Sequence, residues 1–306
     1  MPQKTDKTKL VKRHLSLIST TSSWSRALRA GLEDDGGFDW TTLGTLTRPD
    51  RRVRARIVAK SEGIWAADGL IEAMAAVEPK IRIRQKIFDG ERLRAGQLVC
   101  EWQGPADRVL ALERPFLNLA SYTGGIAMRT FGLVEQVRKA WKGPGNPPRV
   151  TATRKTLPGY RDLAICGVLA GGGHSHRVSL SGGVLIKENH IASAGGIEAA
   201  VKGVRGIAPH GLRIEIEVRD EKELRSALNQ RVDAVLLDNF SPSDARAAVK
   251  TIAKSADSDR IIVEISGGLN EENIAQYVFE GVHVLSVGSL THSVAAIDLS
   301  LLVEGT

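Results

Sequence analysis

The sequence is poor in cysteine, in aromatic residues and in long apolar segments, and each shortage argues against a class of protein. Its two cysteines, Cys100 and Cys166, lack the close spacing of a zinc or redox motif, which argues against a disulfide scaffold and favours a reducing compartment such as the cytoplasm. No apolar run approaches the roughly 20 residues of a membrane helix, and the N-terminus lacks the apolar block of a secretory signal. We therefore expect no membrane partner.

The 306 residues carry a net charge of +7, much of it in a few segments. Residues 1–24 form a basic leader, which we interpret as a flexible tail. Residues 52–57 and 80–87 alternate charged with apolar residues, a pattern typical of strands with one wet and one buried face. A basic rim around an active site is a weaker interpretation. RNA binding is weaker still, because no aromatic ladder accompanies the charges, and we expect no nucleic-acid partner.

The first half of the chain mixes helical segments with these two strands. With 42% hydrophobic and 25% charged residues, the chain can bury enough core for two domains. We place the domain boundary near Arg129, ahead of a proline-rich loop. The elements predicted in this half are a short helix at 25–31, a turn-rich loop at 33–42, a helix at 66–76 and a long helix or helix pair over 112–128.

The second half repeats short apolar runs that each end at a polar residue. These polar residues are roughly 20 to 35 positions apart, the length of one strand plus one helix, and segments 197–201 and 220–228 between them look helical. The repeat predicts βα units in a parallel barrel or doubly wound sheet, and the active site of such a barrel lies at the C-terminal strand ends. The polar residues at those ends are Arg154, Lys187, Glu215, Asp238, Glu264 and Ser286.

Cations and glycines crowd together in residues 151–190. An arginine binds carboxylate or phosphate through two hydrogen bonds, a lysine supplies a point charge, and glycines let the main chain approach a ligand. The segment therefore predicts a pocket for a small polyanion. Its cationic residues are Arg154, Lys155, Arg161, His174, His176, Arg177, Lys187 and His190.

Short motifs of the second half stand in a recognisable order. They are residues 153–159 (TRKTLPG), 171–177 (GGGHSHR), 185–190 (LIKENH), 215–218 (EIEV), 237–239 (LDN), 264–268 (EISGG) and 288–293 (GSLTHS). Two further segments of the same set lie upstream, an acidic loop at residues 33–42 and a helix at residues 113–118. From about residue 25 to the C-terminus, the ordered set resembles the nicotinate-nucleotide pyrophosphorylase family, also called quinolinate phosphoribosyltransferase.

The resemblance implies an α/β protein with an N-terminal α/β sandwich domain (25–129, joined by 291–306) and an incomplete (β/α) barrel domain (130–290). It also implies a pentosyltransferase that joins quinolinate to phosphoribosyl pyrophosphate and leaves nicotinate mononucleotide, pyrophosphate and CO2, a step of de novo NAD biosynthesis. Mg²⁺ accompanies the pyrophosphate. The expected assembly is a homodimer in which the N-terminal domain of one subunit helps to close the barrel site of the other.

Roles for individual residues follow from the resemblance. It implies that the two carboxylates of quinolinate are held by Arg154, His176, Arg177 and Lys187, with Arg114 of the partner subunit. It implies that phosphoribosyl pyrophosphate is held by Lys155, Glu215, Asp238, Ser266, Gly267, Gly268, Gly288 and Ser289.

The expected catalytic residues are Lys155, Lys187, Glu215 and Asp238. Of these, Glu215 and Asp238 are the expected Mg²⁺ ligands, because hard cations prefer oxygen. Glu217 ranks below Glu215, since it can simply pair with a cation of the barrel interior. His190 is interpreted as a residue that orients Lys187.

Two positions depart from the family pattern, and other functions remain open. Gly182 and His283 stand where the family has aspartates, so the substrate of a related phosphoribosyltransferase could differ. A barrel lyase that uses Lys187 as a Schiff-base amine is a rival from another enzyme class. A basic RNA-binding protein on an inactive barrel is the non-enzymatic alternative.

Overall fold

A computed structural model describes residues 21–256 and 258–304 and separates the chain into two compact units. Unit 1 comprises Met1–Phe131, Thr156–Gly172 and Ser293–Thr306, and unit 2 comprises Gly132–Lys155 and Gly173–His292. The prediction for residues 1–20 of the leader lies outside the described residues. No helix in the described ranges is both long and apolar enough to cross a membrane.

Unit 1 contains a four-stranded antiparallel sheet in the order β12-β1-β5-β3. The alternation predicted at 52–57 is confirmed, because Ala55 and Ile57 are buried while Arg54 and Arg56 point to the opposite, exposed face. Strand β12, near the C-terminus, pairs with β1. The bounds are β1 Arg52–Ala59, β3 Arg82–Gln85, β5 Leu98–Pro105 and β12 Leu299–Val303, and a separate two-stranded pair joins β2 Gly63–Ile64 to β4 Arg92–Leu93.

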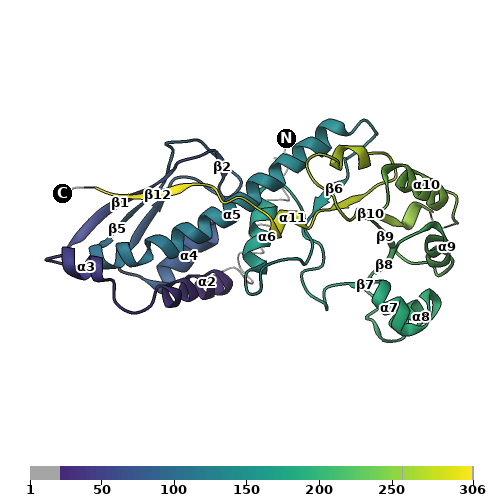
Figure 1. Cartoon of the computed structure of the whole chain (residues 1–306), viewed down its shortest axis with the longest axis horizontal. Helices are drawn as coiled ribbons and strands as arrows, with labels where there is room; N and C mark the ends of the chain where they lie inside the picture. Colours follow the sequence, from purple (N-terminus) through teal and green to yellow (C-terminus); the bar gives the residue numbers. More distant parts are fainter. Residues whose placement is uncertain (1–20, 257, 305–306) are drawn as a thin grey trace, which may run out of the picture. The chain divides into compact units, whose positions relative to one another are not determined.

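Helices lie along one side of this sheet (Figure 1). The core between them centres on large side chains that are at most 1% exposed, among them Trp24, Trp65 and Trp102. Trp102 meets Phe116 edge to face, with ring centroids 4.9 Å apart, a geometry that the charge distribution of aromatic rings favours. The helices of this unit are α2 Thr21–Asp34, α3 Trp40–Thr45, α4 Asp68–Val77 and α6 Arg161–Ala170, together with most of α5 Ala106–Ala140.

Two segments near the start of the described chain differ from those predicted. Helix α2 begins at Thr21 rather than Ser25, and Ser23 and Trp24, placed in the leader by the sequence, are buried. The turn-rich stretch 33–42 contains the end of α2 and the start of α3, where the Asp39 side chain caps the helix by accepting the Thr42 N–H at 3.0 Å.

The expected barrel domain, 130–290, is also divided differently in the structure. Residues 156–172 belong to unit 1, because Leu163 of α6 is part of its core. The predicted boundary at Arg129 falls within α5, which is one continuous helix of 35 residues. The chain therefore passes between the units at several points.

Unit 2 contains a parallel six-stranded sheet in the order β6-β11-β10-β9-β8-β7, which confirms the predicted βα units. The end strands β6 and β7 do not pair with each other, so the described sheet is an incomplete barrel. Its strands are β6 Arg149–Thr151, β7 Val184–Ile186, β8 Ile214–Val218, β9 Ala234–Asp238, β10 Ile262–Ser266 and β11 Val284–Ser286. Its helices include α7 Glu188–Ala194, α8 Ile197–Ile207, α9 Glu221–Asn229, α10 Pro242–Ala253 and the short α11 Ser289–His292.

Local sequence explains where two of these helices begin. Asp220 accepts the backbone N–H of Glu223 at 2.8 Å and so caps α9. Ser241 caps α10 in the same way, and Pro242 follows at the first helical turn, where its missing N–H is not needed. These caps end the loops that follow β8 and β9, so they help to hold the C-terminal strand ends in place.

Candidate active site

The C-terminal strand ends of unit 2 surround a pocket of about 530 Å³, within the range of roughly 300–1,000 Å³ for small-molecule sites. Nine of the predicted site residues line it. They are Arg154, Lys155, His176, Arg177, Lys187, Asp238, Ser266, Gly267 and Gly268. The other lining residues are Thr153, Leu185, Glu188, Glu217, Leu236, Asn239 and Glu264.

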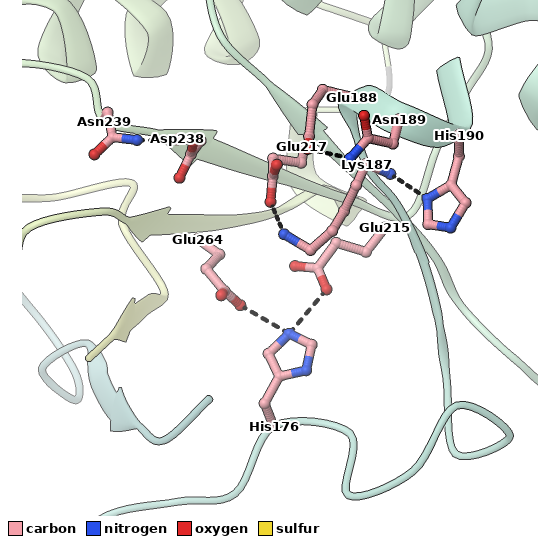
Figure 2. A network of polar contacts seen from close by, with 10 residues as sticks. All are labelled: His176, Lys187, Glu188, Asn189, His190, Glu215, Glu217, Asp238, Asn239 and Glu264. Atoms are coloured by element: carbon pink, nitrogen blue, oxygen red, sulfur yellow. Dashed lines mark hydrogen bonds and ion pairs between the residues drawn. The ribbon is translucent and has the colours of Figure 1, made fainter. Parts of the chain in front are cut away.

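His176 lies between two carboxylates, those of the buried Glu264 and the partly buried Glu215 (Figure 2). Its Nε2 is 3.1 Å from Glu215 Oε2 and 3.5 Å from Glu264 Oε2. Burial alone would lower the pKa of His176, but the bonds to Glu215 and Glu264 outweigh it and raise the pKa to about 10. The backbone N–H of Arg177 points at Nδ1 from 2.7 Å and opposes a second ring proton there. In either protonation state, the Nε2 proton faces the carboxylates.

Both ring nitrogens of His176 are therefore engaged within the protein. The sequence assigned this histidine to the quinolinate clamp, and it lines the pocket; its contact with Arg177 also gives it a positioning role. It accepts the backbone N–H of Arg177, a residue that lines the pocket and donates from Nη1 to the Gly183 carbonyl at 3.0 Å.

Lys187 forms an ion pair with Glu217, and the two differ sharply in exposure. The Lys187 side chain is 42% exposed, while that of Glu217 is 6% exposed. Burial raises the pKa of Glu217, and the lysine acts against that shift. His190 contacts Lys187 directly, because its Nδ1 accepts the backbone N–H of Lys187 at 2.9 Å (Figure 2), and its role in orienting the lysine stays a prediction.

The sequence ranked Glu215 above Glu217, and the structure favours the reverse order. Both side chains leave the same face of β8, but Glu217 lines the pocket while Glu215 lies beside His176 and does not. The charge of Asp238 also acts on Glu217. Glu215 instead belongs to a compact group with His176 and Glu264, whose candidate ligand atoms all lie within 4.8 Å of one another.

The loop after β10 exposes backbone to the pocket. Gly267 and Gly268 have φ values of +98° and +63°, which disfavour residues with a side chain. A Cβ at Gly267 would lie 2.3 Å from Asn239 Oδ1, so no larger residue fits. The combination of bare backbone and close packing suits a cradle for an anionic group, as the sequence predicted.

Three other predicted residues lie outside the pocket lining. Gly288 packs behind Lys155, because a Cβ there would be 3.3 Å from the lysine Cδ. Ser289 begins α11. Arg114 belongs to unit 1, where its side chain is 67% exposed and lies 3.7 Å from Glu113.

Several buried polar atoms of unit 2 have no hydrogen-bond partner in the part of the chain that the structure describes. An unpaired buried polar atom costs about 1–3 kcal/mol, more when charged, so such atoms mark places where a ligand can bind. Two of the five are guanidinium nitrogens of the pocket. The atoms are Arg154 Nε, Arg177 Nε, Glu264 Oε1, Ser286 Oγ and Ser289 Oγ.

The two departures from the family pattern lie away from this pocket. Gly182 is exposed in a turn that begins at Ser179 and is not among the lining residues. His283 precedes β11 and accepts the backbone N–H of Val263 through Nδ1 at 3.0 Å. An aspartate could accept the same bond, so the histidine takes over a structural contact at the N-terminal ends of the strands.

The sequence placed Glu264 at the C-terminal end of a strand but gave it no role in the site, and it left out Glu188 and Asn239. Glu264 is 3% exposed, and a charged residue within an apolar strand was the signal that could have identified it. Glu188 directly follows Lys187, and Asn239 directly follows Asp238. Their positions next to predicted site residues were a second signal.

The sequence matches two family models, described as the quinolinate phosphoribosyl transferase C-terminal domain over residues 114–302 and the N-terminal domain over residues 39–123. It is 37% identical over 278 residues to the probable nicotinate-nucleotide pyrophosphorylase (carboxylating) of Methanothermobacter thermautotrophicus, with 91% of this chain and 98% of that protein covered. It is 34% identical over 288 residues to the human nicotinate-nucleotide pyrophosphorylase (carboxylating), with 94% and 91% covered.

Solved structures show the same likeness. The nicotinate-nucleotide pyrophosphorylase from Francisella tularensis matches with a TM-score of 0.83 at 31% identity, covering 93% of this chain and 97% of that chain. The one from Ehrlichia chaffeensis matches with a TM-score of 0.82 at 30% identity, covering 94% and 99%.

Proposed function

Because the chain belongs to the quinolinate phosphoribosyltransferase family, we propose that its unit 2 pocket joins quinolinate to phosphoribosyl pyrophosphate. The products are nicotinate mononucleotide, pyrophosphate and CO2, so the reaction is a step of NAD biosynthesis. The observation that carries the assignment to this pocket is the convergence of four cations, Arg154, Lys155, Arg177 and Lys187, on a cavity of ligand size. Both substrates are polyanions, and the pocket matches them in charge and scale.

Arg154 and Arg177 bind the two carboxylates of quinolinate in this proposal. Each arginine lines the pocket and carries a buried Nε without a partner among the described residues. A hydrogen bond between charged groups contributes about 1.5–3 kcal/mol, so pairing with a carboxylate removes an unfavourable state and adds a favourable contact. His176 accepts the backbone N–H of Arg177 and so helps to position this arginine.

Lys155 and the 266–268 loop bind phosphate oxygens of the second substrate. Glu217 and Asp238 face the same pocket, where their carboxylates fit the ribose hydroxyls and the oxygen-rich coordination that Mg²⁺ prefers. A bound Mg²⁺ would supply charge neutralisation for the departing pyrophosphate. We place this role on Glu217 rather than on Glu215, which the sequence favoured.

Catalysis in this pocket rests on positioning and electrostatics. As the bond from C1 of the ribose to pyrophosphate breaks, positive charge develops on the sugar and the pyridine nitrogen bonds to C1. When the adjacent carboxylate departs as CO2, the bonding electron pair stays on the ring carbon, where the positive nitrogen stabilises it until that carbon takes up a proton. Lys155 and Lys187 neutralise the negative charges that would otherwise repel one another.

The geometry disfavours the rival Schiff-base reaction. An amine that attacks a carbonyl must be uncharged. The amine of Lys187 is instead held in an ion pair with Glu217, which occupies the nitrogen that would have to attack. The lysine therefore suits anion binding better than nucleophilic catalysis.

We further propose a homodimer in the cytoplasm. The largely exposed Arg114 is available to a second subunit, where it would add a cation to the quinolinate clamp. Both cysteines are free, and burial raises the pKa of each thiol to about 12, so neither is poised for redox chemistry. Analytical ultracentrifugation combined with Arg114→Ala tests the shared site, because the variant should remain dimeric and lose quinolinate affinity.

The direct test is turnover of the purified full chain. Incubation with quinolinate, phosphoribosyl pyrophosphate and Mg²⁺ should yield nicotinate mononucleotide and CO2 in equal amounts. Reactions that lack either substrate are the controls and should yield neither product. Absence of product with Mg²⁺ or any other divalent cation would overturn the proposal.

A further inference from the structure

The sheet of unit 1 has a second face that its helices do not cover. Arginines occupy alternate positions on β1 and β3 and point to this side, opposite the buried Ala55 and Ile57. The strand register places them in rows across β5, with Arg54 opposite Gln103 and Gln103 opposite Arg82. We call this surface the basic sheet face. Its cationic residues are Arg52, Arg54, Arg56, Arg82, Arg84 and Lys86.

Charge is distributed unevenly over the basic sheet face. One row crosses Glu101, which pairs with Lys86 at 3.0 Å, and in the same row Arg56 pairs with Glu304 at 3.1 Å. The row through Gln103 continues to Glu304, whose backbone N–H donates to the Arg54 carbonyl at 2.9 Å, but the carboxylate of Glu304 pairs with Arg56. Its two arginines, Arg54 and Arg82, are exposed and make no ion pair with any described residue. The unneutralised charge therefore concentrates over Gln103.

The spacing of these arginines suits a short polyanion. Same-face neighbours along a strand are about 7 Å apart, and residues two strands apart are about 10 Å apart. Two long guanidinium side chains can close over that span from opposite sides, and each can bind a phosphate through two hydrogen bonds. The Gln103 amide lies between them as a further donor.

The face is hollowed rather than flat. A cavity of about 440 Å³ opens over it, comparable to a small-molecule site. No exposed aromatic ring lines the cavity, since Trp102 is 1% exposed, so it offers no stacking platform for single-stranded nucleic acid. The lining residues are Arg54, Ala55, Arg56, Arg82, Ile83, Arg84, Glu101, Trp102, Gln103 and Glu304.

We propose that this cavity is a second anion site, which binds the di- or triphosphate group of a small molecule between Arg54 and Arg82. Every residue that lines it belongs to unit 1, and none lines the pocket of unit 2. The inference is therefore independent of the proposed activity, and it assigns a use to the alternating basic segments of the sequence.

The test is calorimetric titration of the full chain with inorganic tripolyphosphate, at low salt and at physiological salt. The variant Arg54→Gln with Arg82→Gln removes the two unpaired cations. The matched control is Arg138→Gln with Arg225→Gln, which removes the same charge from exposed helix positions that already pair with neighbouring glutamates. Any binding in the unit 2 pocket is common to both proteins and cancels in the comparison.

Loss of two charged hydrogen-bonding partners should weaken one class of tripolyphosphate sites by about 10- to 100-fold in the sheet variant only. The melting temperature and the turnover of that variant should match those of the control. Equal affinity of the two variants would overturn the proposal. The proposal would also be overturned, in favour of a macromolecular partner, if a 12-nucleotide RNA or polyglutamate bound at this face and tripolyphosphate did not bind.

Discussion

The ion pair between Lys187 and Glu217 predicts opposite outcomes for two substitutions that each break it. Replacing Lys187 with Met leaves the carboxylate of Glu217 without its cation at 6% exposure. Replacing Glu217 with Gln leaves an ammonium group that is 42% exposed and can turn to water. The substitutions remove the same bond, so their difference in stability measures the burial of the carboxylate.

The expected magnitudes follow from those exposures. Stranding one member of a fully buried pair costs about 3–5 kcal/mol. Because the lysine is partly exposed, the pair is partly screened, and we discount the figure to roughly 2–3 kcal/mol for Lys187→Met. For Glu217→Gln we expect about 0–1 kcal/mol. A unit of this size shifts its melting temperature by about 2–4 °C per kcal/mol, so Lys187→Met should lower it by roughly 4–12 °C.

The pH dependence supplies a second signature. The pKa of Glu217 is already raised in the folded protein, chiefly by burial, and loss of the lysine raises it further. A carboxyl whose pKa is higher in the folded than in the unfolded state destabilises the protein as pH rises through these values. The defect of Lys187→Met should therefore be large at pH 8 and shrink towards pH 5.

Differential scanning calorimetry at both pH values checks this, with the double variant Lys187→Met, Glu217→Gln as the control. The double variant should melt close to Glu217→Gln, because no buried charge remains in it. If Glu217→Gln destabilises the protein as much as Lys187→Met at pH 8, the reasoning from burial is wrong.

Three further predictions concern other parts of unit 2. Arg177→Ala should raise the KM for quinolinate about 10- to 100-fold in steady-state assays, and much less that for phosphoribosyl pyrophosphate; equal effects would mean that the arginine is misassigned. Glu217→Gln should lower kcat and weaken the Mg²⁺ dependence far more than Glu215→Gln, and the reverse order would restore the ranking made from the sequence. Burial lowers the pKa of His283, so its contribution to stability is present above about pH 6.5 and is lost as pH falls below it. The variant His283→Asn, which can accept the same backbone N–H, should reduce the fall in melting temperature below that pH. An unchanged fall would mean that another group causes it.

Periodicity was enough to predict the elements that bury one face against a core. The alternation at 52–57 predicted β1 because Ala55 and Ile57 had to lie on the side opposite the arginines. The parallel strands of unit 2 were predictable for a different reason. They are buried on both faces, so they read as short apolar runs that stop at a polar residue.

Other boundaries depend on contacts between distant residues, which no local pattern reveals. Trp24 lies in a segment that resembles a polar leader, yet it packs so closely on Gly69 that a Cβ there would be 2.5 Å from the indole ring. In the same way, α6 follows β6 in sequence but places Leu163 in the core of unit 1. Only the tertiary partner explains either assignment.

The site was predictable to the level of the strand end and not beyond it. The rule that functional groups follow the C-terminal ends of parallel strands brought Arg154, Lys187 and Asp238 to one pocket. It did not separate Glu215 from Glu217, because a period of two places both on the same face of β8. Depth along the strand separates them, since Glu217 is the nearer of the two to its C-terminal end.

The most direct test of the proposed activity follows the carboxyl carbon attached beside the ring nitrogen of quinolinate. With that carbon isotopically labelled, the full chain should release one labelled CO2 for each pyrophosphate formed, and only when phosphoribosyl pyrophosphate is present. The other carboxylate should remain in nicotinate mononucleotide. Release of labelled CO2 without the phosphoribosyl donor, or formation of pyrophosphate without loss of the label, would contradict transfer to the nitrogen followed by decarboxylation.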